Sequence, residues 1–206
     1  MKTTNEYEIA WWKEGKEYIV GIDEAGRGPI AGPLVVAGVC FPKHYHHDEI
    51  YDSKKVSDKK RKQLLREIIT DALEYHVLII PVDVIDQLNI YRATQKAMQD
   101  LVTLFERVDG VLSDAMPLPI CEKPVIPLVK GDQKSVSIAA ASILAKEVRD
   151  GIMRGYDCLY PTYDFAKHKG YPTKRHLEAL HANGVLSIHR KSYGPVAALS
   201  QISLDI

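Results

Sequence analysis

Two apolar runs near the start of the chain constrain the fold more than any other feature. Residues 18–24 read Tyr-Ile-Val-Gly-Ile-Asp-Glu, and residues 33–41 read Pro-Leu-Val-Val-Ala-Gly-Val-Cys-Phe. Each run has the length and the β-branched content of a buried strand. A glycine- and proline-rich segment joins them. The pattern predicts a β-hairpin whose first strand ends in the paired acids Asp23 and Glu24.

The rest of the 206-residue chain alternates strand and helix patterns. We expect strands over residues 77–82, 108–114 and 124–129, and amphipathic helices over residues 58–73, 92–107, 135–153 and 174–183. Ser57 and Thr173 are expected to be N-caps, and Gly184 to end the last helix. This order predicts an α/β domain with a mixed sheet, helices on its faces, and ligands near the strand C-terminal ends. We expect one domain over residues 1–206, with a helical C-terminal subdomain from about residue 155 to 206.

Composition indicates an ordinary soluble globular protein, with 46% hydrophobic and 26% charged residues. The formal net charge of zero argues against a strong non-specific DNA binder. Two basic segments, residues 54–62 and 167–176, could still line a groove for phosphates. For the run 59–62 alone, a solvated helix face is an equally good interpretation.

Several features predict a cytoplasmic protein with no membrane segment. Residues 1–16 carry scattered charges in place of the apolar core of a secretory signal. The longest apolar stretch, residues 30–42, is too short to span a bilayer. Cys40, Cys121 and Cys158 are far apart in the sequence, which predicts free thiols in a reducing compartment.

Acidic residues stand where predicted strands end: Asp23 with Glu24, then Asp114, then Asp132. Carboxylates that converge at one edge of a sheet repel each other unless a cation neutralises them. Hard divalent cations prefer such all-oxygen sites, and two of them can cleave a phosphodiester. Taken singly, Asp114 or Asp132 is more often a turn residue or a helix cap, so the metal hypothesis depends on convergence.

Glu24 raises a geometric difficulty, because neighbouring residues of a strand point to opposite faces of the sheet. Asp23 and Glu24 cannot both enter one site from a regular strand. We predict that the pleat breaks here, or that Glu24 contributes in another way, for instance through its backbone carbonyl.

Residues 26–32, Gly-Arg-Gly-Pro-Ile-Ala-Gly, follow the acids and are called the glycine turn below. Glycine lets a backbone approach a ligand closely, so amides and carbonyls here could bind a sugar hydroxyl or a phosphate. The third glycine is one position late for a dinucleotide-binding fingerprint, and the chain has no P-loop motif. The alternative is an ordinary hairpin turn.

Five motifs in order resemble the ribonuclease HII family over roughly residues 18–195. They are Gly21-Ile22-Asp23-Glu24-Ala25-Gly26-Arg27-Gly28, Asp52-Ser53-Lys54-Lys55, Lys130-Gly131-Asp132-Gln133-Lys134-Ser135, Ile138-Ala139-Ala140-Ala141-Ser142-Ile143-Leu144-Ala145-Lys146 with Arg149-Asp150, and His168-Lys169-Gly170-Tyr171-Pro172-Thr173. The resemblance implies a ribonuclease H-like fold with a helical C-terminal part.

The resemblance also implies a site. Its four metal-binding, catalytic carboxylates would be Asp23, Glu24, Asp114 and Asp132, with Mg²⁺ or Mn²⁺ bound, two ions during catalysis. The backbone of Gly26, Arg27 and Gly28 would read the ribose 2′-hydroxyl. Lys54 would hold a backbone phosphate, and Tyr171 would stack on the sugar that follows the ribonucleotide. Without the resemblance, Tyr171 would be taken as a tyrosine packing at a helix start.

The implied substrates are RNA–DNA hybrids and duplex DNA that contains single ribonucleotides. Cleavage would fall on the 5′ side of the ribonucleotide and leave a 3′-hydroxyl and a 5′-phosphate. We expect a role in ribonucleotide excision and in removal of RNA from DNA, performed by a monomer. Alternatives are another nuclease or resolvase of the same fold, and a non-enzymatic nucleic-acid-binding module. The acids argue against a pure binder, which gains nothing from carboxylates that face phosphates.

One departure qualifies the resemblance. Ala115 follows Asp114 where the family usually places glycine, so we expect the local turn to differ. The sister family, ribonuclease HIII, has a sizeable N-terminal domain, which we do not expect here because 22 residues precede Asp23. A loop with His44, His46, His47 and Asp48 is better explained as polar surface than as a transition-metal site.

Overall fold

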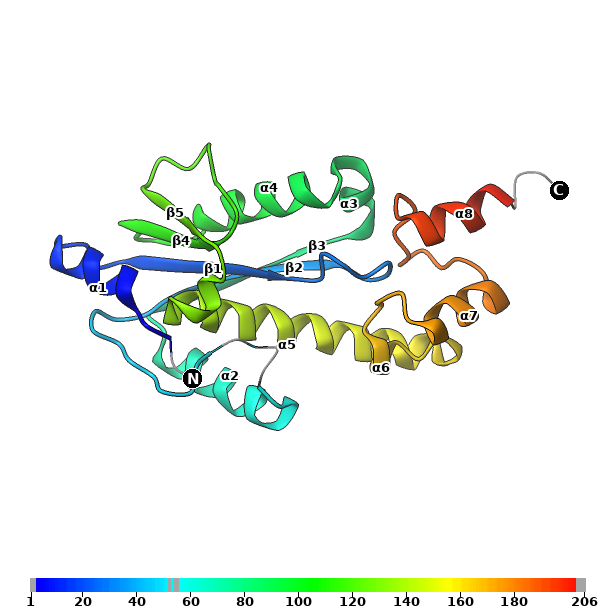
Figure 1. Ribbon diagram of the computed structural model, residues 1–206, viewed down its shortest axis with the longest axis horizontal. Coiled ribbons are helices and arrows are strands. Elements are labelled where there is room, and N and C mark those ends of the chain that lie inside the picture. The colour runs from blue at the N-terminus through cyan, green and yellow to red at the C-terminus, as the bar shows by residue number, and fades with distance from the viewer. Residues whose placement is uncertain (1–2, 52, 54–55, 203–206) are drawn as a thin grey trace. The chain divides into compact units, whose positions relative to one another are not determined.

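The computed structural model describes residues 3–51, 53 and 56–202 (Figure 1). Contacts group the chain into two compact units, each described by itself. Unit 1 comprises the chain up to Ala25 together with Val35–Leu78 and Thr94–Glu147. Unit 2 comprises Gly26–Leu34, Ile79–Ala93 and the chain from Val148. The division into one domain with a subdomain from about residue 155 stays a prediction.

A five-stranded mixed sheet has the order β3-β2-β1-β4-β5. The hairpin is confirmed, because β1 and β2 pair in antiparallel fashion, whereas β1–β4 and β4–β5 are parallel. The bounds are β1 Ile19–Ala25, β2 Leu34–Cys40, β3 Glu74–Ile80, β4 Gly110–Asp114 and β5 Val125–Leu128. Strand β3 starts three residues before the predicted run, because its first residues are polar and only partly buried.

Helices cover both faces of the sheet in unit 1. Figure 1 shows α4 (Ile90–Val102) on one side, and α2 (Asp58–Asp71) with the start of α5 (Val136–Leu159) on the other. At Gly21 of β1, an added Cβ would lie 2.2 Å from the backbone of Ser137. On the opposite face, a Cβ at Gly38 would lie 2.8 Å from Leu101 of α4. Glycine at position 21 therefore lets α5 lie directly on the strand that ends in Asp23.

The predicted helix caps are confirmed. The Ser57 side chain accepts a hydrogen bond from the Lys60 amide at the start of α2. Thr173 does the same for α7 (Lys174–Asn183), which ends at Gly184 with a φ of 83°. Two lengths were wrong: α4 ends at Val102, five residues before the predicted end, and α5 continues six residues beyond its predicted end to Leu159.

Short helices at α1 (Glu6–Lys13) and α3 (Val82–Leu88) were not predicted from the sequence. In α1, Trp11 and Trp12 are buried against the sheet and the start of α5. Unit 2 contains two further helices, α6 (Phe165–His168) and α8 (Gly194–Ile202). Its core joins them to α7 and the end of α5 through buried apolar side chains that include Met153, Phe165, Leu180 and Val196.

Candidate active site

Asp23 lies near the C-terminal end of β1 and is 5% exposed. Its Oδ1 accepts a hydrogen bond from the Glu24 amide at 2.7 Å. Burial raises the pKa of the Asp23 carboxyl well above its usual range, and the neighbouring charges of Glu24 and Asp114 raise that pKa further. A buried acid whose charged form is opposed by two other acids is typical of a site that binds a cation or performs chemistry.

Asp114 is brought toward Asp23 because β1 and β4 are parallel neighbours that both end in acids. Oδ1 of Asp114 accepts a hydrogen bond from the Gly131 amide at 2.8 Å. Gly131 opens a short 3₁₀ turn, Gly131–Gln133, which follows β5 and contains the half-buried Asp132. The structure thus places the predicted acids of three strand ends around one edge of the sheet in unit 1.

The acids at the strand ends lie at one edge of the sheet, but they do not form a complete set of metal ligands. Among the residues that the structure describes, no three His, Cys, Asp or Glu side chains are arranged so that they could hold a metal ion. The donors are of the right kind, because carboxylate oxygens suit hard divalent cations. The repulsion that raises the Asp23 pKa is also what a bound cation would relieve. The four-carboxylate ligand set stays a prediction.

The predicted break in the pleat at Asp23 and Glu24 is wrong. Pairing with β2 continues regularly through Glu24 and Ala25, opposite Val36 and Val35. The backbone departs from the strand only at Gly26, whose φ is 106°. A contribution of Glu24 by another route, such as its backbone carbonyl, stays a prediction.

A buried polar network supports Asp23 from the side of α5, and the sequence did not single it out. Ser142 of α5 is hydrogen-bonded to Asp23, and its Oγ lies 2.9 Å from the Oγ of Ser53. Arg61 donates to the Ser53 carbonyl at 3.3 Å and to Glu147 at 2.5 Å. Such a network holds a carboxylate in one orientation. The available signal was Ser142 itself, which stands at the end of an alanine run in one of the five motifs.

In unit 2, the glycine turn lies against the segment that contains Tyr171. The Ile30 amide donates to the Gly170 carbonyl at 2.9 Å. A Cβ at Gly28 would lie only 3.3 Å from the Tyr171 ring, so the absence of a side chain at position 28 leaves this tyrosine room. Tyr171 is 46% exposed, as a ring that stacks on a ligand would be.

Two buried histidines, His176 and His189, fix the backbone of Tyr171. Nδ1 of His176 is 2.9 Å from the Tyr171 carbonyl, and its Nε2 is 3.1 Å from Nε2 of His189. The pKa of each imidazole is lowered to about 4, mainly by burial. The neighbouring His168 also lowers the pKa of His176, and His176 also lowers the pKa of His189. Both rings are therefore neutral at pH 7, and His176 can donate its Nδ1 hydrogen to Tyr171.

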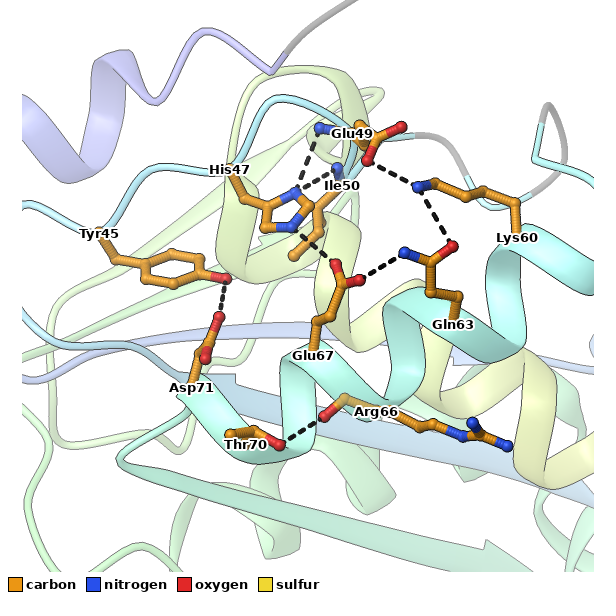
Figure 2. A network of polar contacts seen from close by, with 10 residues as sticks. All are labelled: Tyr45, His47, Glu49, Ile50, Lys60, Gln63, Arg66, Glu67, Thr70 and Asp71. Atoms are coloured by element: carbon orange, nitrogen blue, oxygen red, sulfur yellow. Dashed lines mark hydrogen bonds and ion pairs between the residues drawn. The ribbon is translucent and has the colours of Figure 1, made fainter.

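The loop histidines of unit 1 have separate partners. Figure 2 shows His47 between the loop and α2, with Nε2 2.9 Å from Glu67 and Nδ1 accepting from the amides of Glu49 and Ile50. His46 pairs instead with Asp48 at 2.8 Å. The contact of His47 with Glu67 attaches the loop to α2, whereas His46 pairs within the loop. Such contacts agree with a structural, polar role for these histidines.

Three further predictions concern Lys54, the cysteines and a membrane segment. Lys54 lies outside the described residues, so its predicted phosphate contact stays a prediction. Cys40, Cys121 and Cys158 are free thiols, as expected. Within the part of the chain that the structure describes, no helix is long and apolar enough to cross a membrane.

Comparison with known proteins agrees with this fold. A family model described as Ribonuclease HII matches residues 20–196. A ribonuclease HII from Francisella tularensis is 52% identical over 182 residues, which cover 88% of this chain and 97% of that protein. One from Caldanaerobacter subterraneus is 48% identical over 188 residues, 91% of this chain and 78% of that protein. The crystal structure of ribonuclease H2 from Pyrococcus horikoshii, 23% identical, matches with a TM-score of 0.77 over 92% of this chain and all of that one. The predicted ribonuclease H-like fold is confirmed.

Proposed function

Because the chain belongs to the ribonuclease HII family, we propose that it nicks duplex DNA on the 5′ side of embedded ribonucleotides and also hydrolyses the RNA strand of RNA–DNA hybrids. Its membership makes it an endonuclease of the ribonuclease H type. The observation that carries the proposal is the buried Asp23 carboxyl, whose pKa is raised by burial and by Glu24 and Asp114. A protein that only binds nucleic acid has no use for such a group.

In this proposal Asp23, Glu24, Asp114 and Asp132 hold the divalent cations, Mg²⁺ or Mn²⁺, with two ions during catalysis. When bound, these ions would supply the activation of a water and the stabilisation of the leaving oxygen. The protein's own part is to fix the ligands. The Gly131 amide orients Asp114, and Ser142 with the Glu24 amide orients Asp23.

Recognition of the ribonucleotide is assigned to unit 2. The backbone of Gly26, Arg27 and Gly28 would read the 2′-hydroxyl, which distinguishes RNA from DNA. Tyr171 would stack on the next sugar, and its contact distance to Gly28 supports a joint role. A phosphate contact from Lys54 belongs to the same proposal, as do 3′-hydroxyl and 5′-phosphate products, a cytoplasmic monomer, and a role in ribonucleotide excision and removal of RNA from DNA.

The test uses the full chain, Mg²⁺ and an end-labelled DNA duplex with one ribonucleotide. We expect a single nick at the 5′ side of that ribonucleotide, and no cut in the same duplex made wholly of DNA. Asp23→Asn should abolish the nick and keep the thermal unfolding temperature, because it neutralises a buried acid without changing its size. Absence of any nick by the native protein would overturn the proposal, and full activity of the Asp23→Asn variant would overturn the assignment of the site.

A further inference from the structure

Two arginines are buried in unit 2 without a role in the proposed chemistry. Arg149 of α5 is 1% exposed, and Arg190, in the segment before α8, is 0% exposed. A guanidinium group has five N–H donors and is costly to bury. The hydrogen-bond partners of a buried arginine therefore indicate its role. Every hydrogen-bond partner described for these two groups is a backbone carbonyl or the Tyr193 hydroxyl.

Arg190 joins the two ends of the glycine turn. Its Nη2 donates to the Gly26 carbonyl at 2.6 Å and to the Gly32 carbonyl at 2.9 Å. Its Nη1 donates to the Arg27 carbonyl at 3.2 Å and to the Tyr193 hydroxyl at 3.1 Å. The Tyr193 hydroxyl in turn donates to the Arg27 carbonyl at 2.7 Å. One planar group therefore fixes carbonyls that are six residues apart in the chain.

Arg149 joins the same turn to the segment of Tyr171. Nη2 donates to the Ala31 carbonyl at 3.1 Å, and Nε donates to the Pro33 carbonyl, just after the turn, at 3.0 Å. Nη1 donates to the Lys169 carbonyl at 3.0 Å, two residues before Tyr171. A Cβ at Gly26 would lie 2.2 Å from Nε of Arg149, so the guanidinium occupies the space that a side chain there would need.

Burying two like charges together is unfavourable. Burial, together with the nearby charge of Arg190, lowers the pKa of Arg149 to about 10. Apolar side chains would fill this space at lower cost. What they could not do is bind six carbonyl oxygens in a fixed arrangement, which is the property of the guanidinium fork.

Arg149 and Arg190 together are called the clamp below. The clamp also fixes the direction of the amide groups in the glycine turn. All described peptide bonds are trans, and in a trans peptide the N–H points opposite to the C=O. The carbonyls of Gly26 and Arg27 face Arg190, so the amides of Arg27 and Gly28 point away from it. Arg190, more than 160 positions later in the sequence, thereby fixes the orientation in which Gly28 lies against Tyr171.

We propose that Arg149 and Arg190 are positioning residues for sugar recognition, which fix the glycine turn in place against the segment of Tyr171. This proposal rests on the proposed function for its effect on cleavage, but its structural part stands on the contacts alone. Loss of the clamp should loosen the turn and remove the preference for a ribonucleotide, because a misplacement of about 1 Å can cost roughly 100-fold in rate.

The experiment compares the native protein with Arg190→Lys and Arg149→Lys, in the full chain. Lysine keeps the charge but cannot bridge several carbonyls from one planar group. Tyr193→Phe is a milder variant that removes one hydroxyl from the network and leaves the arginines in place. Arg92→Lys, at an exposed arginine of α4, is the matched control for the substitution itself. Amide hydrogen exchange of residues 26–34 is measured without metal, and kcat and KM are measured on a duplex with one ribonucleotide.

We expect both lysine variants to speed amide exchange in residues 26–34 and to lower kcat by about 10- to 100-fold, with little change in KM. Tyr193→Phe should shift both readouts in the same direction by less. Arg92→Lys should leave exchange in the turn and kcat unchanged. Unchanged exchange in the lysine variants overturns the clamp, and a loosened turn with native kcat overturns its role in recognition. If the native protein does not nick at all, the proposed function fails, and the exchange data still decide whether the clamp exists.

Discussion

At the scale of single residues, Ala115 shows how a departure from a family pattern was resolved. The residue follows Asp114 and has a φ of 53°, in the left-handed region that favours glycine. Its amide still donates to the Leu128 carbonyl at 3.0 Å, which keeps the end of β4 attached to β5. This chain thus makes with alanine a turn that suits glycine, and the backbone strain lies next to a proposed metal ligand.

Ala115→Gly should stabilise the protein slightly. Left-handed backbone costs alanine about 1–2 kcal/mol, and the greater flexibility of glycine in the unfolded chain offsets about 0.4–1 kcal/mol of the gain. We expect a net increase of about 0 to 1.6 kcal/mol in the free energy of unfolding, measured by urea denaturation. Ala139→Gly, inside α5, should instead lower it by about 1 kcal/mol or more. Equal losses in both variants would contradict strain at Ala115.

Tyr171 permits a second prediction at this scale. Its ring is half exposed, and its backbone is held by His176, so Tyr171→Ala should not unfold the protein. Loss of a stacking contact worth about 1–3 kcal/mol should lower kcat/KM at a single ribonucleotide roughly 5- to 150-fold. The concentration of Mg²⁺ that gives half-maximal rate should not change.

Tyr91→Ala is the matched control for Tyr171→Ala, because Tyr91 is a tyrosine of 45% exposure on α4. It should keep native rates. An equal loss for Tyr171→Ala on single-ribonucleotide duplexes and on long hybrids would count against a role at the junction.

At the scale of elements, the first turn of α5 is completed by a helix that was not predicted. Oδ1 of Asn5 accepts from the Val136 amide at 3.1 Å. The Glu8 carboxyl accepts from the Ser135 hydroxyl at 2.6 Å and from the Ser137 amide at 3.3 Å. Amides at a helix start have no partner within the helix, so α1 supplies what α5 lacks. Helix α5 also contains Ser142, which is hydrogen-bonded to Asp23. The contacts of Asn5 and Glu8 therefore stabilise the helix that supports Asp23.

Removal of the Glu8 carboxyl should destabilise the protein. Glu8→Ala leaves a buried hydroxyl and a buried amide without this acceptor, which costs about 1–3 kcal/mol for each group left unsatisfied. Glu8→Gln keeps an acceptor oxygen and should cost less. Glu6→Ala, on the exposed side of the same helix, should change the free energy of unfolding by less than about 0.5 kcal/mol. Urea denaturation of the three variants checks the order, and a neutral Glu8→Ala would show that α1 does not cap α5.

At the scale of the whole molecule, the buried histidines make stability depend on pH. The pKa of His176 and of His189 falls from an ordinary value of 6.5 to about 4 in the folded chain. Between these values the unfolded chain binds protons that the folded chain does not. Stability from these rings is therefore lost as the pH falls from about 6.5 toward 4, by about 1.4 kcal/mol per pH unit for each ring. The carboxyls of Glu8 and Asp23 act in the opposite sense, because burial raises their pKa.

A comparison of variants isolates the histidine contribution. His189→Gln removes one ring, so the free energy of unfolding should fall less steeply between pH 6.5 and 4 than in the native protein. His181→Gln changes an exposed histidine of α7 and should keep the native slope. Urea denaturation at a series of pH values gives the slopes. Identical slopes in all three proteins would contradict a neutral, buried His189.

Local signals predicted the elements that have them. The hairpin of β1 and β2 followed from two apolar runs, and α2 and α7 followed from Ser57 and Thr173. Helix α1 was missed because it is short and its N-cap, Asn5, makes no capping bond within the helix. It is stabilised instead by Trp11 and Trp12, which pack on the sheet. Short elements of this kind depend on tertiary contacts more than on their own propensity.

The sequence by itself determined that acids stand at strand ends, that a glycine turn follows the first pair, and that the motifs resemble ribonuclease HII. These are properties of residues close together in the chain, where periodicity, caps and turn residues act. Only the tertiary structure decided which groups meet: Ser142 with Asp23, and Arg190 with a carbonyl 164 positions earlier. Partners so distant in sequence are chosen by packing of the sheet and helices, and no local pattern records that choice.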